Sequence, residues 1–361
     1  MAKFDRKIIL ALNAHPKIGS QTLKKLLLSV DNPEKIWKLS RAELSRRLEP
    51  KLLDILFEAR EKYNPEQEFE KITKYDVGYV TIYDKEYPYL LKEIPDAPVI
   101  LYMKGDSSVL HDPAVAVVGS RKYTEYGASV AQKLTKSLAS NSLTIVSGLA
   151  LGIDAVAHQA TLDVSGITIG VLGCGLDRVY PVSNYNLGKS IIEKGGAIIS
   201  EFSLGTPPTN YNFPIRNRII AGLSLGTLVI EAAENSGSLI TAGLALEYNR
   251  EVFAVPGNID SPMSYGTNKL IKDGAIPVTE VGDVLRVLNI EEKKNEAKAK
   301  EIFPENENEA KVFEILKNGE KSGDELIKLS KFNVIELNSI LTMMELKGLI
   351  KNIGGGRYKL V

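Results

Sequence analysis

Short apolar runs alternate with helical patterns over the middle of the chain, between residues 113 and 288. In the helical stretches apolar residues recur every three or four positions, whereas the short runs are apolar throughout. Strands that are apolar on both faces are typical of a parallel sheet, because helices cover both of its sides. The pattern therefore predicts an α/β fold with an extended Rossmann-like parallel sheet as its core. The expected strands are residues 114–118, 143–146, 167–172, 197–200, 227–230 and 252–255.

The chain before this core is expected to contain two parts. Residues 1–64 show only helical periodicity and predict a small helical domain. Within it, residues 16–25 resemble a degenerate helix-hairpin-helix, a motif that approaches a DNA phosphate. The second glycine of that motif is missing, so a SAM-like helical interaction module explains the segment equally well. Residues 65–112 carry short β-type runs and form a lead-in, so that the core domain as a whole spans residues 65–290.

The chain after the core predicts a linker and a second folded domain. Residues 291–307 are rich in Glu and Lys and poor in apolar side chains, which is typical of a solvated linker. Residues 308–361 show three helical patterns followed by a glycine-turned hairpin, the order of elements in a winged helix. The three helices are expected at about residues 308–317, 322–329 and 333–347.

Composition excludes several classes of protein. Of the 361 residues, 44% are hydrophobic and 25% are charged, close to the average for globular proteins, so a disordered or fibrous chain is excluded. The single cysteine, Cys174, excludes an internal disulfide framework and fits a reducing compartment. The longest uncharged stretch, residues 137–153, is interrupted by polar residues and is a poor candidate for a membrane span. With no secretory signal at the N-terminus, these features favour a cytoplasmic protein.

The charge is balanced over the whole chain but not along it. Lys and Arg number 45, as do Asp and Glu, so a simple polycation is excluded. Residues 1–64 contain 14 Lys and Arg against 8 Asp and Glu, and residues 311–361 contain 9 against 6. The middle of the chain is therefore acidic, and any site for an anion must be local.

Metal-dependent and nucleophilic chemistry find no support in the residue pattern. The three histidines, His15, His111 and His158, are far apart and belong to no zinc motif. Cys174 follows an apolar strand and is best explained as a buried thiol. A Walker A motif is also missing. We therefore expect no metal or other cofactor, and ATP hydrolysis is not indicated.

Two predicted strands end in turns that suit a phosphate group. Gly119-Ser120-Arg121 precedes a helix that is expected to begin near Thr124, where backbone N–H groups and the helix dipole favour an anion. An ordinary strand-to-helix turn with a surface arginine explains this sequence about as well. Ser147-Gly148 opens the next helix in the same way. There Asp154 and His158 are spaced as an acid–base pair, although a structural role for Asp154 in the first helical turn is favoured.

A third loop, residues 231–242, follows another predicted strand and is rich in hydroxyl groups. Ser236 and Ser238 could contact a phosphate. Alternatively, Ser238 is simply the N-cap of the next helix.

Residues 210–218 combine an aromatic side chain with cations. Phe213 is followed closely by Arg216, Asn217 and Arg218, which supplies a face for base stacking and charges for a nucleic-acid backbone. The alternative is a helix start with Phe213 in the core. Because Arg216, Asn217 and Arg218 are adjacent, they point in different directions on a helix, so at most two of them can face one ligand.

Taken together, these segments resemble the DNA-processing protein A (DprA, or Smf) family. The matching stretches lie between residues 113 and 285 in the order and spacing of that family, and the flanking helical and winged-helix modules fit a full-length member. The motifs that carry the resemblance are Val117–Arg121, Tyr126-Gly127, Ser147–His158, Gly173–Asp177, Tyr180-Pro181, Phe213-Pro214, Arg216–Ile220, Ser236–Ala242 and Phe253–Gly257.

The resemblance implies a non-catalytic protein that binds incoming single-stranded DNA, protects it and loads the RecA recombinase during natural transformation. It also implies a homodimer formed through the Rossmann-like core. The family's DNA pocket corresponds to Gly119, Ser120, Arg121, Phe213, Arg216, Asn217 and Arg218, and loop position adds Ser147, Gly148, Ser236 and Ser238. Because the core is acidic, we expect a confined cationic patch around Arg121 and Arg218, with backbone N–H groups sharing the phosphate contacts and acidic surface elsewhere.

Two other functions stay open at this point. The first is a Rossmann-type nucleotide phosphoribohydrolase, although residues 235–242 lack the Pro-Gly-Gly and the glutamate of that signature. The second is a winged-helix regulator of duplex DNA. Its recognition helix, near residues 334–346, contains no Arg or Lys, which argues against strong duplex binding.

Overall fold

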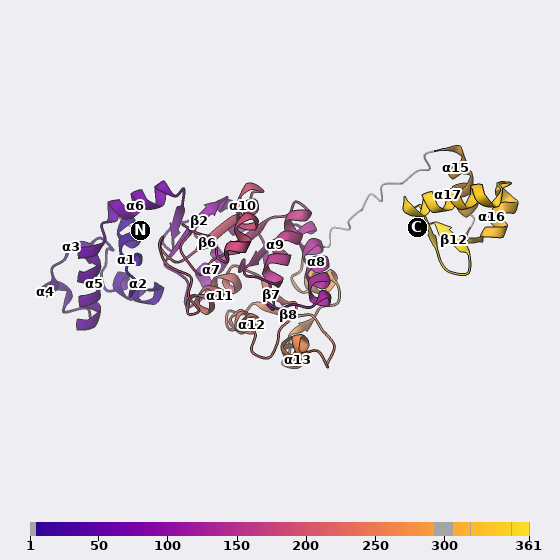
Figure 1. Ribbon diagram of the computed structural model, residues 1–361. Coiled ribbons are helices and arrows are strands. Elements are labelled where there is room, and N and C mark those ends of the chain that lie inside the picture. Colours follow the sequence, from indigo (N-terminus) through magenta and orange to yellow (C-terminus); the bar gives the residue numbers. More distant parts are fainter. Residues whose placement is uncertain (1–4, 292–305, 318, 348, 361) are drawn as a thin grey trace. The chain divides into compact units, whose positions relative to one another are not determined.

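A computed structural model describes residues 5–291, 306–317, 319–347 and 349–360. The chain divides into two compact units, Met1–Lys293 and Lys294–Val361 (Figure 1). Most of the predicted linker, residues 292–305, lies outside the described residues. Among the helices that the structure describes, none is both long and apolar enough to cross a membrane.

The first unit begins with six helices that pack on one edge of a sheet. Their apolar residues share one core with residues of the sheet, such as Ile100 and Tyr102. The Tyr102 hydroxyl donates to Asn13 Oδ1 at 2.9 Å, and the Val99 amide donates to Ser20 Oγ at 3.0 Å. The helical part thus packs directly against the sheet and extends beyond residue 64. The helices are α1 (Lys7–Asn13), α2 (Ser20–Leu28), α3 (Lys35–Lys38), α4 (Arg41–Leu44), α5 (Pro50–Lys62) and α6 (Pro65–Lys74).

The sheet has nine strands in the order β1-β2-β6-β5-β4-β3-β7-β8-β9. The seven strands from β6 to β9 along this order are parallel, while β2 and β1 add to the β6 edge in antiparallel fashion. All six strands predicted between residues 113 and 288 are present, with ends that differ by one residue at most. The strands are β1 (Gly78–Thr81), β2 (Ile100–Gly105), β3 (Ala114–Val118), β4 (Thr144–Ser147), β5 (Thr168–Val171), β6 (Ala197–Ser200), β7 (Gly226–Val229), β8 (Glu251–Ala254) and β9 (Ile276–Pro277).

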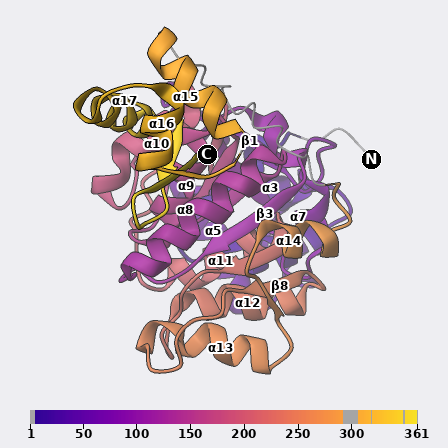
Figure 2. The same ribbon diagram turned by 90° about the vertical axis from the view of Figure 1, so that its right-hand side faces the viewer.

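Helices cover both faces of the sheet, as the apolar strands require. Val115 and Val117 of β3 pack on one face with α8, α9 and α14, whereas Ala116 and Val118 pack on the other with α11 and α12. Figure 2 shows α10 and α13 at opposite ends of the unit, in keeping with their packing beside β6 and β8. The helices are α7 (Tyr89–Glu93), α8 (Glu125–Ser140), α9 (Ile153–Asp163), α10 (Tyr185–Glu193), α11 (Asn212–Gly222), α12 (Gly237–Glu247), α13 (Tyr265–Lys272) and α14 (Val281–Val287), with short 3-10 helices at Ser107–His111, Val182–Asn184 and Pro262–Ser264.

The second unit is a winged helix with its own core. Helices α15 (Glu307–Lys317), α16 (Gly323–Ser330) and α17 (Val334–Leu346) precede a hairpin of β11 (Ile350–Asn352) and β12 (Arg357–Leu360). The three predicted helices and the hairpin are confirmed. A short strand that the sequence pattern did not reveal, β10 (Lys321–Ser322), pairs with β12. The core of this unit contains Val312, Leu316, Leu326, Leu337, Leu341, Met344, Leu349 and Ile350.

Because each unit has a separate core, we predict that the first unit folds alone. A chain ending at Glu291 should unfold in urea in one transition, with a free energy of unfolding within about 0.5 kcal/mol of the first unit's transition in the full chain. Circular dichroism during urea unfolding gives the number of transitions and the free energy of unfolding for both chains. Loss of the folded state on truncation would show that the first unit depends on the second.

Candidate functional site

A pocket of about 760 Å³ lies at the carboxyl ends of the central strands. The loops that line it follow β3, β4, β7 and β8, and the start of α11 closes it. The chain runs outward from β3 to β6 on one side and from β7 to β9 on the other, so the strand order reverses between β3 and β7. Ligands of open α/β sheets bind in the crevice at such a reversal. This pocket is therefore the leading candidate for the functional site.

The pocket brings together most, but not all, of the residues that the sequence singled out. Gly148 lines a smaller hollow that adjoins the pocket and shares Arg121, Phe213 and Arg216 with it. Ser147 and Arg218 line neither space. The predicted residues that line the main pocket are Gly119, Ser120, Arg121, Phe213, Arg216, Asn217, Ser236 and Ser238.

The glycines of the first two turns serve loop packing. A Cβ atom on Gly119 would lie 2.7 Å from the Ile153 side chain. Gly152 has φ +91°, and a Cβ atom there would lie 2.3 Å from the Ser120 carbonyl oxygen. The loops after β3 and β4 can touch only because these positions lack side chains.

Two backbone amides of the first turn donate within the protein. The Ser120 amide donates to the Glu231 carbonyl at 2.8 Å, and the Lys122 amide donates to Ser120 Oγ at 3.0 Å. At the N-terminus of α8, the Glu231 carboxylate accepts from the Thr124 amide at 2.9 Å and from its hydroxyl at 2.6 Å. A carboxylate of the protein thus occupies the place that the sequence suggested for a phosphate.

In the second turn, too, a carboxylate of the protein accepts from backbone amides. Asp154 Oδ2 accepts from the amides of Gly148 at 3.1 Å and Ala150 at 3.4 Å. Burial raises the pKa of Asp154. The Ser147 hydroxyl donates to the Val117 carbonyl at 2.7 Å, so it holds two strands together. These contacts give Ser147 and Asp154 structural roles.

His158 and Cys174 are buried and have no role in the pocket. His158 Nδ1 lies 2.7 Å from Thr168 Oγ1, and burial lowers the pKa of His158 to about 3. Burial raises the pKa of the Cys174 thiol to about 11, in agreement with a structural thiol. The spacing of Asp154 and His158 therefore reflects helix packing. Within the described ranges, no group of three or more His, Cys, Asp or Glu could hold a metal ion.

The third turn caps α12. The Ser236 hydroxyl accepts from the Ser238 amide at 3.4 Å and lies 2.7 Å from the Ser238 hydroxyl. Ser236 is the N-cap, so the expectation that Ser238 caps this helix is wrong by two residues. Both hydroxyls still line the pocket.

Arg216 lines the pocket but is 4% exposed. Its guanidinium donates to the carbonyl oxygens of Gly148, at 2.6 Å, and Val171, which joins α11 to the ends of β4 and β5. Burial lowers the pKa of Arg216 to about 10. Asn217 Oδ1 accepts from Arg216 Nε at 3.2 Å. Arg216 therefore acts mainly as an anchor for α11.

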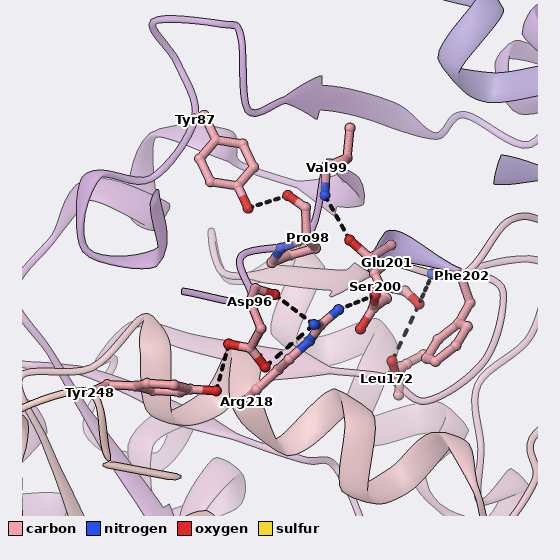
Figure 3. Close-up of polar contacts among 11 residues, drawn as sticks. Tyr87, Asp96, Pro98, Val99, Leu172, Ser200, Glu201, Phe202, Arg218 and Tyr248 are labelled. Atoms are coloured by element: carbon pink, nitrogen blue, oxygen red, sulfur yellow. Dashed lines mark hydrogen bonds and ion pairs between the residues drawn. The ribbon is translucent and has the colours of Figure 1, made fainter. Parts of the chain in front are cut away.

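Arg218 does not line the pocket and lies in a buried network, which Figure 3 shows. It donates to Glu201 Oε2 at 2.5 Å and to the Asp96 carbonyl at 2.5 Å, and the Tyr248 hydroxyl donates to Asp96 Oδ1 at 2.7 Å. Two carboxylates thus balance its charge. The expected cationic patch around Arg121 and Arg218 is corrected accordingly, because Arg218 contributes no charge to the pocket surface.

The accessible chemistry at the Phe213 side of the pocket is an aromatic ring beside two exposed cations, and the exposed Tyr265 lines the pocket as well. Arg121 and Lys122 are both exposed. The Arg121 guanidinium carbon lies 5.3 Å from the centre of the Phe213 ring, within cation–π range. Tyr180 stacks on Phe213 with ring centres 5.7 Å apart and planes at 19°. Sequence reasoning did not assign Lys122 or Tyr180 to the site, although Lys122 directly follows the Gly-Ser-Arg turn.

The doubly wound sheet, its pocket at the strand reversal and the appended winged helix define a Rossmann-like protein of two units. The chain belongs to the family described as DNA recombination-mediator protein A, whose profile matches residues 78–289. A profile of the DprA winged helix domain matches residues 296–356. The resemblance to the DprA/Smf family is thereby confirmed.

Three relatives illustrate the match. Protein Smf of Escherichia coli is 51% identical over 202 residues, which make up 56% of this chain and only 54% of that protein. The X-ray structure of DprA from Streptococcus pneumoniae has a TM-score of 0.70 and 39% identity, covering 79% of this chain and 98% of that one. DprA from Helicobacter pylori, solved to explain its single-stranded DNA binding mode, has a TM-score of 0.53 and 32% identity, covering 58% and 95% of the two chains.

We predict that Arg218→Ala lowers the free energy of unfolding by about 3–5 kcal/mol, because it leaves Glu201 buried without its partner. Burial already raises the pKa of Glu201, and the loss of the arginine raises it further. A protonated carboxyl needs no counter-charge, so the loss should shrink as the pH falls from neutral to mildly acidic. Urea unfolding of the variant and of the unmodified protein at neutral pH and at mildly acidic pH measures this difference in the free energy of unfolding.

Arg286→Ala is the matched control. Arg286 is an arginine on α14 whose side chain is 75% exposed, so its removal should cost less than about 0.5 kcal/mol. An Arg218→Ala protein as stable as this control would show that the buried network does not stabilise the fold.

Proposed function

We propose that this chain binds single-stranded DNA in the pocket at the carboxyl ends of β3 and β7. The observation that carries the proposal is the exposed Arg121 guanidinium beside the Phe213 ring, with Lys122 next in the chain. Stacking on an aromatic ring and cations along the backbone are the means by which single strands are bound without sequence preference. Phe213 then stacks on a base, while Arg121 and Lys122 contact the flanking phosphates.

The electrostatics of the pocket suit a local anion site on an acidic core. Three cations line it, Arg121, Lys122 and Arg216, against two carboxylates, Asp154 and Glu234. Asp154 is turned toward backbone amides, which reduces its effect on a ligand. The amides of Ser120 and Lys122 are engaged within the protein. Side chains, more than backbone N–H groups, therefore hold the phosphates.

Membership of the family extends the proposal. The Helicobacter pylori relative, solved for its single-stranded DNA binding mode, matches this chain over the core. We infer by the same resemblance that this chain protects incoming DNA, loads RecA during natural transformation, and acts as a non-catalytic homodimer in the cytoplasm. Arg216, Asn217, Ser236 and Ser238 are proposed as further pocket residues, whereas Ser147 and Arg218 support the pocket from behind.

The first functional prediction concerns the two exposed cations. Replacing both Arg121 and Lys122 by Ala should weaken binding to oligothymidylate at least about tenfold, because two charge-assisted phosphate contacts are lost. The plot of log affinity against log salt should become less steep by about 1.4, since each phosphate contact to a single strand contributes about 0.7. Fluorescence anisotropy over a salt series measures both quantities.

Arg286→Ala again serves as the control and should leave affinity and salt dependence unchanged. Binding that is equally strong in the double variant would contradict the proposed site.

Incubation of the unmodified protein with nucleoside monophosphates tests the phosphoribohydrolase alternative, since release of free base would establish an enzyme.

The second functional prediction concerns the winged helix. Helix α17 contains no Lys or Arg between Val334 and Leu346, so it offers no cation to a phosphate. A chain ending at Glu291 should therefore bind oligothymidylate within about threefold of the full chain, a difference near 0.6 kcal/mol. If all DNA binding is lost on this truncation, the winged-helix reading is favoured instead.

A further inference from the structure

The main pocket and the smaller hollow beside it form one continuous groove that extends past Phe213. A smaller hollow continues from the main pocket and shares Arg121, Phe213 and Arg216 with it. Its far side is formed by Leu151, from the loop after β4, and by Tyr180, from the loop after β5. A ligand that fills the main pocket can therefore extend toward the end of β5 without leaving the groove.

Apolar side chains gather at this far side. Of the residues that line it, Tyr180 is 43% and Leu151 50% exposed, and the chain after Tyr180 continues with two further exposed apolar side chains, Val182 at 78% and Tyr185 at 56%. Exposed aromatic and aliphatic groups that lie next to a binding groove mark an interaction surface more often than groups scattered singly. Arg178, the cation of this loop, pairs with Asp177 at 2.6 Å, so the surface has little net charge. It suits the face of a base better than a phosphate.

The loop that carries these side chains is held firmly. The Asn184 side-chain amide donates to the carbonyl oxygens of Leu149, at 3.0 Å, and Ala150, at 3.1 Å. Gly188 of α10 packs against Leu149 and Val179, and a Cβ atom there would lie 3.4 Å from each. The Tyr180 ring is already parallel to Phe213. A preorganised ring loses little entropy when a base stacks on it.

We propose that Tyr180 is a second base-stacking position and that the single strand runs from Phe213 across Tyr180 toward the end of β5. This inference rests on the proposed function and adds the direction of the strand. The occupant is the next base of the same strand, because the hollow is continuous with the main pocket. Stacking requires only an aromatic face, so this position selects no particular base.

Three variants test the proposal by anisotropy with oligothymidylates of increasing length. Tyr180→Ala should bind the longer oligonucleotides about tenfold more weakly, since it loses one stacked base. Tyr180→Phe keeps the ring and should bind like the unmodified protein. Tyr89→Ala, which removes an exposed tyrosine on α7, is the control and should change nothing.

Tyr180 also touches Phe213, so a purely structural effect must be distinguished. An oligonucleotide made only of abasic residues offers nothing to stack, and on it Tyr180→Ala and the unmodified protein should bind alike. An equal loss on the abasic strand would show that Tyr180 only positions Phe213 or the phosphate-binding side chains, and would overturn the proposal. Light-induced crosslinking of a 5-iodouracil oligonucleotide, mapped by mass spectrometry, should mark Tyr180 as well as Phe213.

The two proposals can fail separately. If the Arg121 and Lys122 double variant loses binding but Tyr180→Ala binds every length normally and forms no crosslink site, the strand does not take this path. If neither variant changes binding, the proposed function itself fails. Normal DNA binding by Tyr180→Ala would mean that this apolar surface contacts a protein partner instead of DNA, which would equally overturn the inference.

Discussion

Two buried arginines fix helix α11, and the pocket depends on them. Burying a guanidinium is costly unless carbonyl or carboxylate oxygens accept from it, so the positions of these oxygens fix where each arginine lies. Arg216 finds the carbonyls of Gly148 and Val171, at the ends of β4 and β5. Arg218 finds Glu201 and Asp96 on the other side of the helix. Phe213 lies one turn earlier, and its place beside Arg121 follows from this anchoring.

A second constraint concerns the ends of the strands. Parallel strands that feed into helices create several positions where amide groups attract an anion. In this protein two carboxylates fill such positions: Glu231 comes from the loop after β7, and Asp154 from the first turn of the helix that follows its own loop. The loops become rigid as a result, and the charge that meets a ligand comes from Arg121 and Lys122. Under the proposed function, a small cationic surface on an acidic core favours strands that can also stack over polyanions that offer only charge.

Much of the fold could be predicted from the sequence, because it depends on local patterns. Continuous apolar runs are explained only by strands covered on both faces, and the order of strands and helices then leads to a doubly wound sheet. The winged helix followed from three helical patterns and a glycine turn. The pairing of β10 with β12 escaped prediction because a strand of two residues has no periodicity to detect.

The sequence by itself determined the architecture, the family and most of the segments that surround the pocket; the segment that contains Pro262, Met263 and Tyr265 was not among them. Only the tertiary structure decided which side chain of each segment faces the ligand space. Arg216 and Arg218 look alike in the sequence as cations near an aromatic residue, yet both are buried, and their partners lie in segments far away in the chain. Composition cannot show where a charge is neutralised, because pairing depends on contacts between distant residues. Tyr180 gains its place in the same way, because the fold brings the loop after β5 against Phe213 of α11.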